Sequence, residues 1–187
     1  MELRKLNLLD EALAYYDRAL ALRRDDIGAL NNRAGVLIDL NRIPEALASY
    51  DQSLSIDPNN FHALAMRGLA FERLNRPEEA LGSYDKALSV VPSAVEVLYN
   101  RGNVLADLAR LEEALASYEK ALEIKSDAAP IFNNRGLVLE QLSRFNEALA
   151  SYDEALRVNP NYHAAADNRR LLLQELGQTP APHGTKK

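Results

Sequence analysis

The sequence is dominated by a seven-residue phrase that returns at a fixed interval of 34 residues. The phrase reads EALASYD, or a close variant of it, at residues 11–17, 45–51, 79–85, 113–119 and 147–153. A constant period without insertions is typical of stacked supersecondary units, each of which is too small to bury its own apolar face. The period divides the chain into a partial unit at 1–26, full units at 27–60, 61–94, 95–128 and 129–162, and one more helix at about 163–176.

The apolar spacing predicts two helices in each full unit. In the unit 27–60, Leu30, Ala34 and Leu37 follow one another at steps of four and three residues, as one face of a helix requires. Pro44 suits the start of a second helix, and Pro58 ends that helix because proline cannot continue it. The chain contains 32 Leu and 28 Ala, which are strong helix formers. We therefore expect an all-α protein built from helical hairpins.

Positions related by the period share their size and chemistry. Small residues recur on the first helices at Ala34, Gly68, Gly102 and Gly136, and on the second helices at Ala12, Ala46, Ala80, Ala114 and Ala148 and at Ala19, Ser53, Ala87, Ala121 and Ala155. Tyrosines recur on the second helices at Tyr16, Tyr50, Tyr84, Tyr118 and Tyr152, and prolines close three units at Pro58, Pro92 and Pro160. Small residues let helix axes approach closely, and the tyrosines fill the space that remains.

These columns resemble the tetratricopeptide repeat (TPR) family, whose units are 34-residue hairpins with small residues at the helix crossings and a closing proline. The sequence departs from that pattern at Arg24 and Ser126 in the proline column, and at Leu30, Leu64, Leu98 and Phe132, where the family often has Trp. The resemblance implies an all-α, TPR-type right-handed α-solenoid of helix–turn–helix repeats over residues 1–176. It also implies that the first helices line a concave groove.

The two ends of the array differ from its middle. The helix at 163–176 is polar and carries Arg170 in the small-residue column, as expected of a terminal capping helix. Gly177 suits a helix end, and residues 177–187 are expected to form a disordered tail. In the partial unit 1–26, a short first helix is expected to leave the second helix, from about Asp10 to Leu22, with incomplete cover. Such an end fits a fragment of a longer array, or self-association with another chain.

Composition and charge exclude several classes of function. The formal charge of −5 argues against nucleic acid and against an anionic membrane as partners. The chain has no Cys, and its three His stand far apart, so we expect no metal site and no cofactor. No nucleophile, base and acid stand together and no glycine-rich phosphate loop is present, so we expect no enzyme activity. The first residues lack the apolar stretch of a secretory signal, which predicts a cytoplasmic protein.

A recurring asparagine is the main candidate for ligand binding. Helical geometry turns this column away from the apolar stripe, and Asn is a mediocre helix former, so stability does not explain it. The TPR arrays of O-GlcNAc transferase-like proteins resemble this chain in having an asparagine ladder at the matching place, which binds a peptide backbone. A carboxamide offers both the donor and the acceptor that a peptide bond requires. The peptide-binding residues we predict are Asn32, Asn100, Asn134 and Asn168 in the column, with Asn31, Tyr99, Asn103 and Asn133 beside it. The alternative is that the asparagines are inherited repeat sequence without a ligand.

A second polar pattern joins arginines to acids. Each arginine of one column follows an acid of another column by 16 residues. The partial first unit has the acid without the arginine, and the terminal helix has the arginine without the acid. Every acid can therefore pair with an arginine only if each pair joins one unit to the next. We predict structural ion pairs between Asp17 and Arg33, Asp51 and Arg67, Asp85 and Arg101, Glu119 and Arg135, and Asp153 and Arg169. The alternative is a ligand groove lined by arginine.

The sequence thus predicts a protein-interaction scaffold that binds an extended peptide or partner segment in the concave groove. Two alternatives remain open: the substrate-presenting TPR region of a larger enzyme such as an O-GlcNAc transferase-like protein, and a self-assembling structural element. TPR domains that clamp the acidic C-termini of chaperones use Lys and Arg on the groove face, which here offers amides, apolar residues and acids. We therefore do not expect a partner of that kind.

Overall fold

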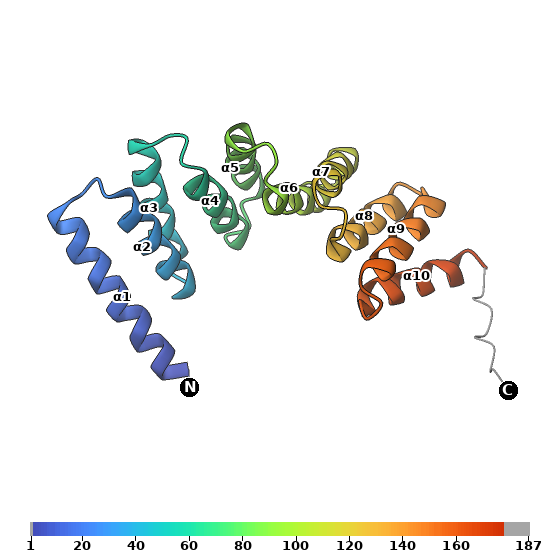
Figure 1. Cartoon of the computed structure of the whole chain (residues 1–187), viewed down its shortest axis with the longest axis horizontal. Helices are drawn as coiled ribbons and strands as arrows, with labels where there is room; N and C mark the ends of the chain where they lie inside the picture. The colour runs from blue at the N-terminus through green and yellow to red at the C-terminus, as the bar shows by residue number, and fades with distance from the viewer. Residues whose placement is uncertain (1, 178–187) are drawn as a thin grey trace. The chain divides into compact units, whose positions relative to one another are not determined.

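The computed structural model of the protein describes the backbone of residues 2–177 and the side chains of residues 8–177. Within these residues the chain is entirely helical between its turns, which confirms the predicted all-α class (Figure 1). The ten helices are α1 (Glu2–Leu22), α2 (Ile27–Asp39), α3 (Ile43–Ile56), α4 (Phe61–Arg73), α5 (Pro77–Val90), α6 (Val95–Asp107), α7 (Leu111–Ile124), α8 (Ala129–Gln141), α9 (Phe145–Val158) and α10 (His163–Glu175). None of these described helices is both long and apolar enough to cross a membrane.

Local chemistry sets where the helices begin and turn. Asp26 and Asn60 cap α2 and α4, because their side chains accept hydrogen bonds from the backbone N–H of Ala29 and Ala63, each at 3.0 Å. Between the two helices of each full unit, one residue takes the left-handed conformation that reverses the chain. These residues are Asn41, Asn75, Ala109 and Ser143, with φ between 55° and 59°. The hairpin turn therefore recurs with the 34-residue period.

The helices group into two compact units, which divide between Val97 and Leu98, inside α6. The terms first unit and second unit refer to these two groups of helices, whereas a full unit is one 34-residue repeat. In the first unit, α2 packs against α1 and α3, and α4 packs against α3 and α5. In the second unit, α8 packs against α7 and α9, and α10 packs against α9 and, less extensively, α8. Within each unit, helices thus contact their partner in the hairpin and the neighbouring repeat. That the two units form one continuous solenoid remains a prediction.

Each glycine-containing hairpin closes on a tyrosine ring that lies directly over the small residue of the first helix. Tyr152 of α9 covers Gly136 of α8 so closely that an added Cβ at Gly136 would lie 2.5 Å from its Cε1 atom. Tyr84 covers Gly68 in the same way, and the tyrosines of all four full units are almost completely buried. The glycine is therefore required by close approach of the ring rather than by backbone conformation.

The tyrosine hydroxyls have different surroundings in different repeats. The hydroxyl of Tyr152 donates to Glu140 Oε1 at 2.5 Å, and that of Tyr84 donates to Glu72. Ile38 stands at the repeat-equivalent position in α2, and the hydroxyl of Tyr50 is one of three buried side-chain polar atoms without a hydrogen-bond partner among the described residues. Burial raises the pKa of Tyr50 to about 12, so this hydroxyl stays protonated and uncompensated.

The N-terminal partial unit differs from our expectation of a short first helix followed by a second one from Asp10. The structure has one continuous helix, α1, across this region. Leu8 occupies the position held in every full unit by an arginine, such as Arg42, that pairs with a glutamate three residues later and supports the turn. Without that support, continuing the helix adds one backbone hydrogen bond per residue at little cost.

The C-terminal end agrees with the sequence where it is described. Arg170 of α10 lies in the small-residue column, is exposed, and pairs with Asp167 of its own helix at 3.0 Å. Gly177 follows the helix with φ 68°, the left-handed conformation expected there. The rest of the predicted disordered tail, residues 178–187, lies outside the described residues.

The unequal hydroxyls predict opposite responses to the same substitution. Tyr50→Phe removes a buried hydroxyl that has no partner among the described residues, so we expect the free energy of unfolding to stay constant or rise by up to about 1 kcal/mol. Tyr152→Phe removes a hydrogen bond to Glu140, and we expect a loss of ~0.5–1.5 kcal/mol. Urea unfolding followed by circular dichroism measures both. Equal losses in the two variants would contradict the assignment of Tyr50 as unpartnered.

Candidate functional site

The arginine column bridges the second helices of successive repeats. Arg33 of α2 donates from Nε to Asp17 Oδ1 of α1 at 2.7 Å, and from a terminal nitrogen to Ser49 Oγ of α3, also at 2.7 Å. One guanidinium therefore ties its own hairpin to the helix before it. A planar group with several fixed donors suits this double contact.

The same acid–arginine contact recurs in both units. Arg67 lies 3.1 Å from Asp51, Arg135 lies 3.3 Å from Glu119, and Arg169 lies 2.5 Å from Asp153, measured between nitrogen and oxygen atoms. The arginine side chains are 21–36% exposed, whereas the acids are 48–60% exposed. Asp85 and Arg101 belong to different units, and their pairing remains a prediction. These arginines use hydrogen-bond donors in contacts between helices. Few donors are left for a ligand, which disfavours the alternative of an arginine-lined ligand groove.

The serine partners of these arginines were not predicted from the sequence. Each serine is buried, accepts a hydrogen bond from an arginine 16 residues earlier, and donates one to the backbone carbonyl four residues earlier. The serines are Ser49, Ser83, Ser117 and Ser151, with arginine contacts of 2.6–3.3 Å. The same 16-residue spacing that revealed the acids was available to reveal the serines.

This geometry predicts how the contact energy is divided around Arg135. The Glu119 carboxylate is half exposed, so the coupling between Glu119 and Arg135 in a double-mutant cycle should be only ~0.2–1 kcal/mol. Ser151 is buried, so Arg135→Ala should cost more than Glu119→Ala in urea unfolding. A coupling well above this range would mean that the carboxylate is far better shielded from water than its exposure indicates.

The predicted peptide-binding asparagines fall into two groups. Asn32 is exposed, and Asn100, Asn134 and Asn168 are half-buried on their first helices. Asn31 and Asn133, by contrast, are only 8% and 5% exposed, so we correct the expectation that they contact a ligand. A neighbouring helix covers each of them. Asn31 donates to the capping residue Asn60 of α4 at 3.1 Å, which makes it a structural residue.

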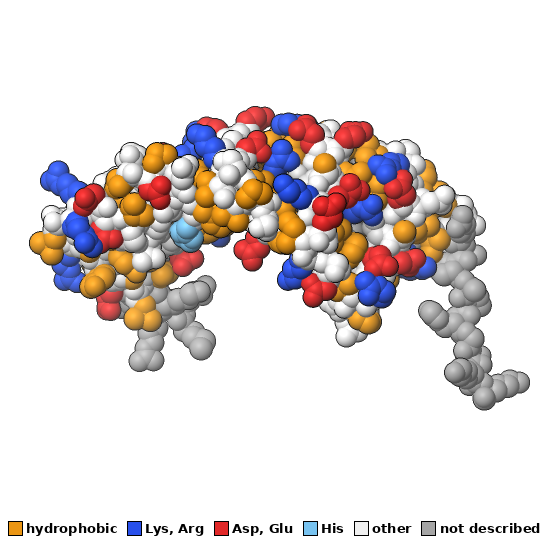
Figure 2. Space-filling view, turned by 45° about the horizontal axis from the view of Figure 1, so that its top comes forward, with side chains coloured by type: hydrophobic (Ala, Val, Ile, Leu, Met, Phe, Trp, Pro, Cys, Tyr) orange, Lys and Arg blue, Asp and Glu red, His pale blue; other side chains and the backbone are white. Residues whose placement is uncertain are grey.

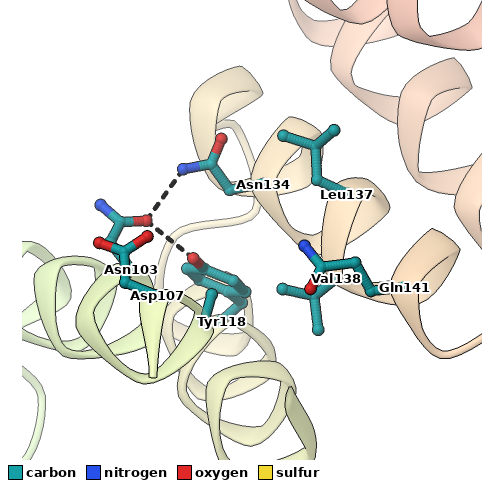
Figure 3. Close-up of a pocket in the computed structure, with 8 residues that line it drawn as sticks. Asn103, Asp107, Tyr118, Asn134, Leu137, Val138 and Gln141 are labelled. Atoms are coloured by element: carbon teal, nitrogen blue, oxygen red, sulfur yellow. Dashed lines mark hydrogen bonds between the residues drawn. The ribbon is translucent and has the colours of Figure 1, made fainter. Parts of the chain in front are cut away.

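In the second unit the amides form a connected hydrogen-bond network. Asn134 Nδ2 of α8 donates to Asn103 Oδ1 of α6 at 2.9 Å and to the Tyr99 hydroxyl at 3.1 Å. The Tyr118 hydroxyl of α7 donates to the same Asn103 oxygen at 2.7 Å (Figure 3). Burial is the main reason that the pKa of Tyr118 lies well above its usual value, so the hydroxyl remains a donor. Asn134 therefore also has a structural role, which the sequence did not indicate.

The network continues from α8 to α10 through the buried Asn133. Its Nδ2 donates to Asn134 Oδ1 at 3.1 Å, and its Oδ1 accepts from Asn168 Nδ2 at 3.0 Å. Asn133 thus fixes the orientation of two amides that are themselves half-buried. Among the described residues, Asn100 makes no side-chain hydrogen bond, and the Asn103 Nδ2 donor has no partner. These two groups are available to an incoming ligand.

A cavity of about 240 Å³ lies beside this network, within the second unit. Asn103 and Asp107 of α6 line one side, Asn134 and Gln141 of α8 line the other, and the Tyr118 ring lies between them (Figure 3). The apolar part of the wall comes from Ala106, Leu137 and Val138. The cavity combines an apolar wall with amide and carboxylate groups, as sites that hold one side chain of a ligand do.

A second hollow, of about 310 Å³, lies at the turn before α9, where Arg144 and Glu147 in its wall already pair with each other. Figure 2 shows acidic and basic side chains interspersed over the face in view, as expected where many of them pair with each other. Within the described part of the chain, no group of three or more His, Asp or Glu side chains is arranged to hold a metal ion. The amide network and its cavity are therefore the principal candidate site.

Paired helices in repeated hairpins, with polar groups gathered on the first helices, define a helical-repeat protein. The tetratricopeptide repeat family matches residues 1–61, 65–129 and 129–162. The chain belongs to this family, which confirms the resemblance found in the sequence. No curated protein matches the chain significantly.

Solved structures of similar fold cover most of the chain. YrrB, described as a TPR protein with an unusual peptide-binding site, is 26% identical, with a TM-score of 0.79 over 90% of this chain and 87% of its own. MamA from Desulfovibrio magneticus is 18% identical, with a TM-score of 0.77 over 82% of this chain and 87% of its own. A tetratricopeptide repeat protein from Parabacteroides merdae is 20% identical, with a TM-score of 0.81 over 95% of this chain and 70% of its own. The last two likenesses concern the fold alone.

Proposed function

We propose that the chain is a protein-interaction scaffold that binds an extended peptide along the first helices of its second unit, α6, α8 and α10. The observation that carries this proposal is the cavity beside the amide network, where Asn103 and Asn134 are held in fixed orientations by Tyr99 and Tyr118. Fixed polar groups beside an apolar wall favour binding because little conformational entropy is lost when a ligand orders them.

The peptide backbone is expected to contact the amides that have unused hydrogen-bonding groups. Asn100 has both its donor and its acceptor available, and Asn168 uses only its donor, toward Asn133. A carboxamide can pair with both the C=O and the N–H of a peptide bond. Because every peptide has these groups, the asparagines supply affinity with little sequence preference.

Selectivity is expected to come from the cavity. Leu137 and Val138 can pack against the apolar stem of a ligand side chain, while Asp107 and Gln141 offer oxygen acceptors to its end. A stem that ends in a cation matches this arrangement, so we propose that a Lys or Arg of the peptide enters the cavity. The same carboxylate disfavours acidic peptides.

The relationship to YrrB gives independent support, because that 26% identical protein is described as having a peptide-binding site. We also propose that the chain is not an enzyme, since TPR arrays typically act through binding. The alternative of a region that presents substrates to an O-GlcNAc transferase-like catalytic domain shares the asparagine column. It has less support, because none of the three structures named above is described as a glycosyltransferase.

The asparagine contacts are tested with peptides selected from a random library on the full chain. Asn100→Ala combined with Asn168→Ala should weaken binding by about tenfold, because each lost hydrogen bond is worth ~0.5–1.5 kcal/mol. Isothermal titration calorimetry measures the affinity. Asn32→Ala is the matched control, since Asn32 belongs to the same column in the first unit and should leave affinity unchanged. Equal effects of the control and the double variant would contradict a site in the second unit.

The proposed selectivity predicts a small, salt-dependent effect of one carboxylate. Asp107→Asn should weaken a selected peptide that contains Lys or Arg by roughly two- to fivefold, as expected for an exposed ion pair. The loss should shrink as ionic strength rises. An acidic C-terminal peptide of the chaperone type should bind no better than its scrambled version. Micromolar binding of that peptide, dependent on its carboxylates, would overturn the proposed preference.

A further inference from the structure

Helix α1 carries an exposed apolar stripe that is separate from its contact with the rest of the protein. Leu8, Tyr15 and Leu22 are 62%, 63% and 92% exposed, and the small residues Ala12 and Ala19 lie between them. The steps along this stripe are four, three, four and three residues, the spacing of a helix–helix seam. We call these five residues the α1 seam.

The α1 seam faces away from the contact with α2. Leu13 is buried against the rest of the first unit, and Asp17 pairs with Arg33 of α2 at 2.7 Å. At 100° per residue, Leu13 and Asp17 lie on the opposite side of the helix from the centre of the seam. One side of α1 therefore packs into the repeat array while the seam remains exposed.

The α1 seam differs at Tyr15 and Leu8 from the repeat-equivalent positions of the full units. The repeat-equivalent positions of Tyr15 are the buried serines, such as Ser49, which accept an arginine from their own first helix. The equivalent of Leu8 is a turn arginine such as Arg42. Ala12 and Ala19 keep the small residues of the repeat-equivalent positions Ala46 and Ser53, which are fully buried, so the α1 seam still permits the close approach of another helix.

The charges beside the α1 seam match a second copy of the same helix running antiparallel. Glu11 and Arg18 are both exposed, lie seven residues apart on one edge of the seam, and have no ion pair among the described residues. In an antiparallel pair this edge faces its own copy, so Glu11 of each helix lies opposite Arg18 of the other. A parallel pair would instead place Arg18 opposite the Arg23 position of the second copy, which is repulsive.

We propose that two copies of the chain associate through antiparallel packing of their α1 helices along the α1 seam. The leucines and the Tyr15 rings pack over the alanines of the opposite helix, which provide the space for them. The two-fold arrangement places Glu11 of each copy opposite Arg18 of the other. It uses the same surface on each copy, so the assembly closes as a dimer. This interface is distinct from the cavity of the second unit.

Sedimentation equilibrium of the full chain across a range of concentrations tests the proposal. We expect a monomer–dimer equilibrium that Tyr15→Ser abolishes, with the circular dichroism spectrum unchanged, because serine is the residue of the other repeats at this position. Leu171→Ser is the matched control, since it removes an exposed apolar side chain from α10 and should leave the dimer intact. A chain that is monomeric at every concentration would overturn the proposal.

Charge reversal tests the antiparallel orientation and does not depend on the tyrosine variant folding. Glu11→Arg and Arg18→Glu should each raise the dimer dissociation constant by roughly tenfold or more, because each creates two like-charged contacts. An equal mixture of the two variants should recover the dimer. In a mixed antiparallel pair, a helix with arginine at both positions faces a helix with glutamate at both, so every contact is again between opposite charges. Dimers insensitive to these changes, or mass that keeps rising beyond the dimer, would show that another surface is responsible.

Discussion

The contact between a tyrosine ring and a glycine backbone is the constraint on which the hairpins depend. The ring of Tyr152 or Tyr84 occupies the volume that a side chain on the first helix would need, so the two helix axes approach closely. The same ring brings its hydroxyl to a half-buried glutamate of the first helix, Glu140 for Tyr152 and Glu72 for Tyr84. In the second unit this places the Tyr118 hydroxyl on Asn103, at the wall of the cavity. Packing and the candidate site are therefore consequences of one contact.

A second layer of polar contacts joins one hairpin to the next. Arg33 of a first helix is held between the acid of the preceding second helix and the serine of its own hairpin, and the contact recurs with the period inside both units. The serine end is buried and the acid end is half exposed, so the strength of the link comes mainly from the buried end. Apolar stacking alone would tolerate sliding between repeats, whereas this directional contact fixes their register.

The sequence predicted the features that recur with the period, because repetition supplies its own confirmation. The first helices begin at Ile27, Phe61, Val95, Ala129 and His163, which are the predicted first residues of the units and the terminal helix. The acid–arginine spacing identified contacts between helices for the same reason. Features that depend on a neighbouring helix were harder to predict. Asn31 and Asn133 were expected to face a ligand because a single helix, considered alone, does not include the helix that covers them.

Non-repeating residues were the least predictable and the most informative. Ile38, which leaves the Tyr50 hydroxyl without a partner among the described residues, and Leu8, which stands where the turn arginine would be, both interrupt an otherwise regular pattern. Asn103 has no asparagine at the equivalent positions of the other full units, which have Gly35, Leu69 and Leu137. The cavity thus arises where the repeats differ, because identical units cannot create a unique site.

Arg170 has a consequence for how such an array can change its length during evolution. If duplication added a second helix of the usual kind directly after α10, its tyrosine would come to a position where a long charged side chain already stands. That product would fold only if Arg170 were replaced at the same time by a small residue. Duplications within the array meet glycine or alanine at every joint and need no second change. Repeats are therefore expected to be gained and lost between the other helices, while α10 is inherited unchanged.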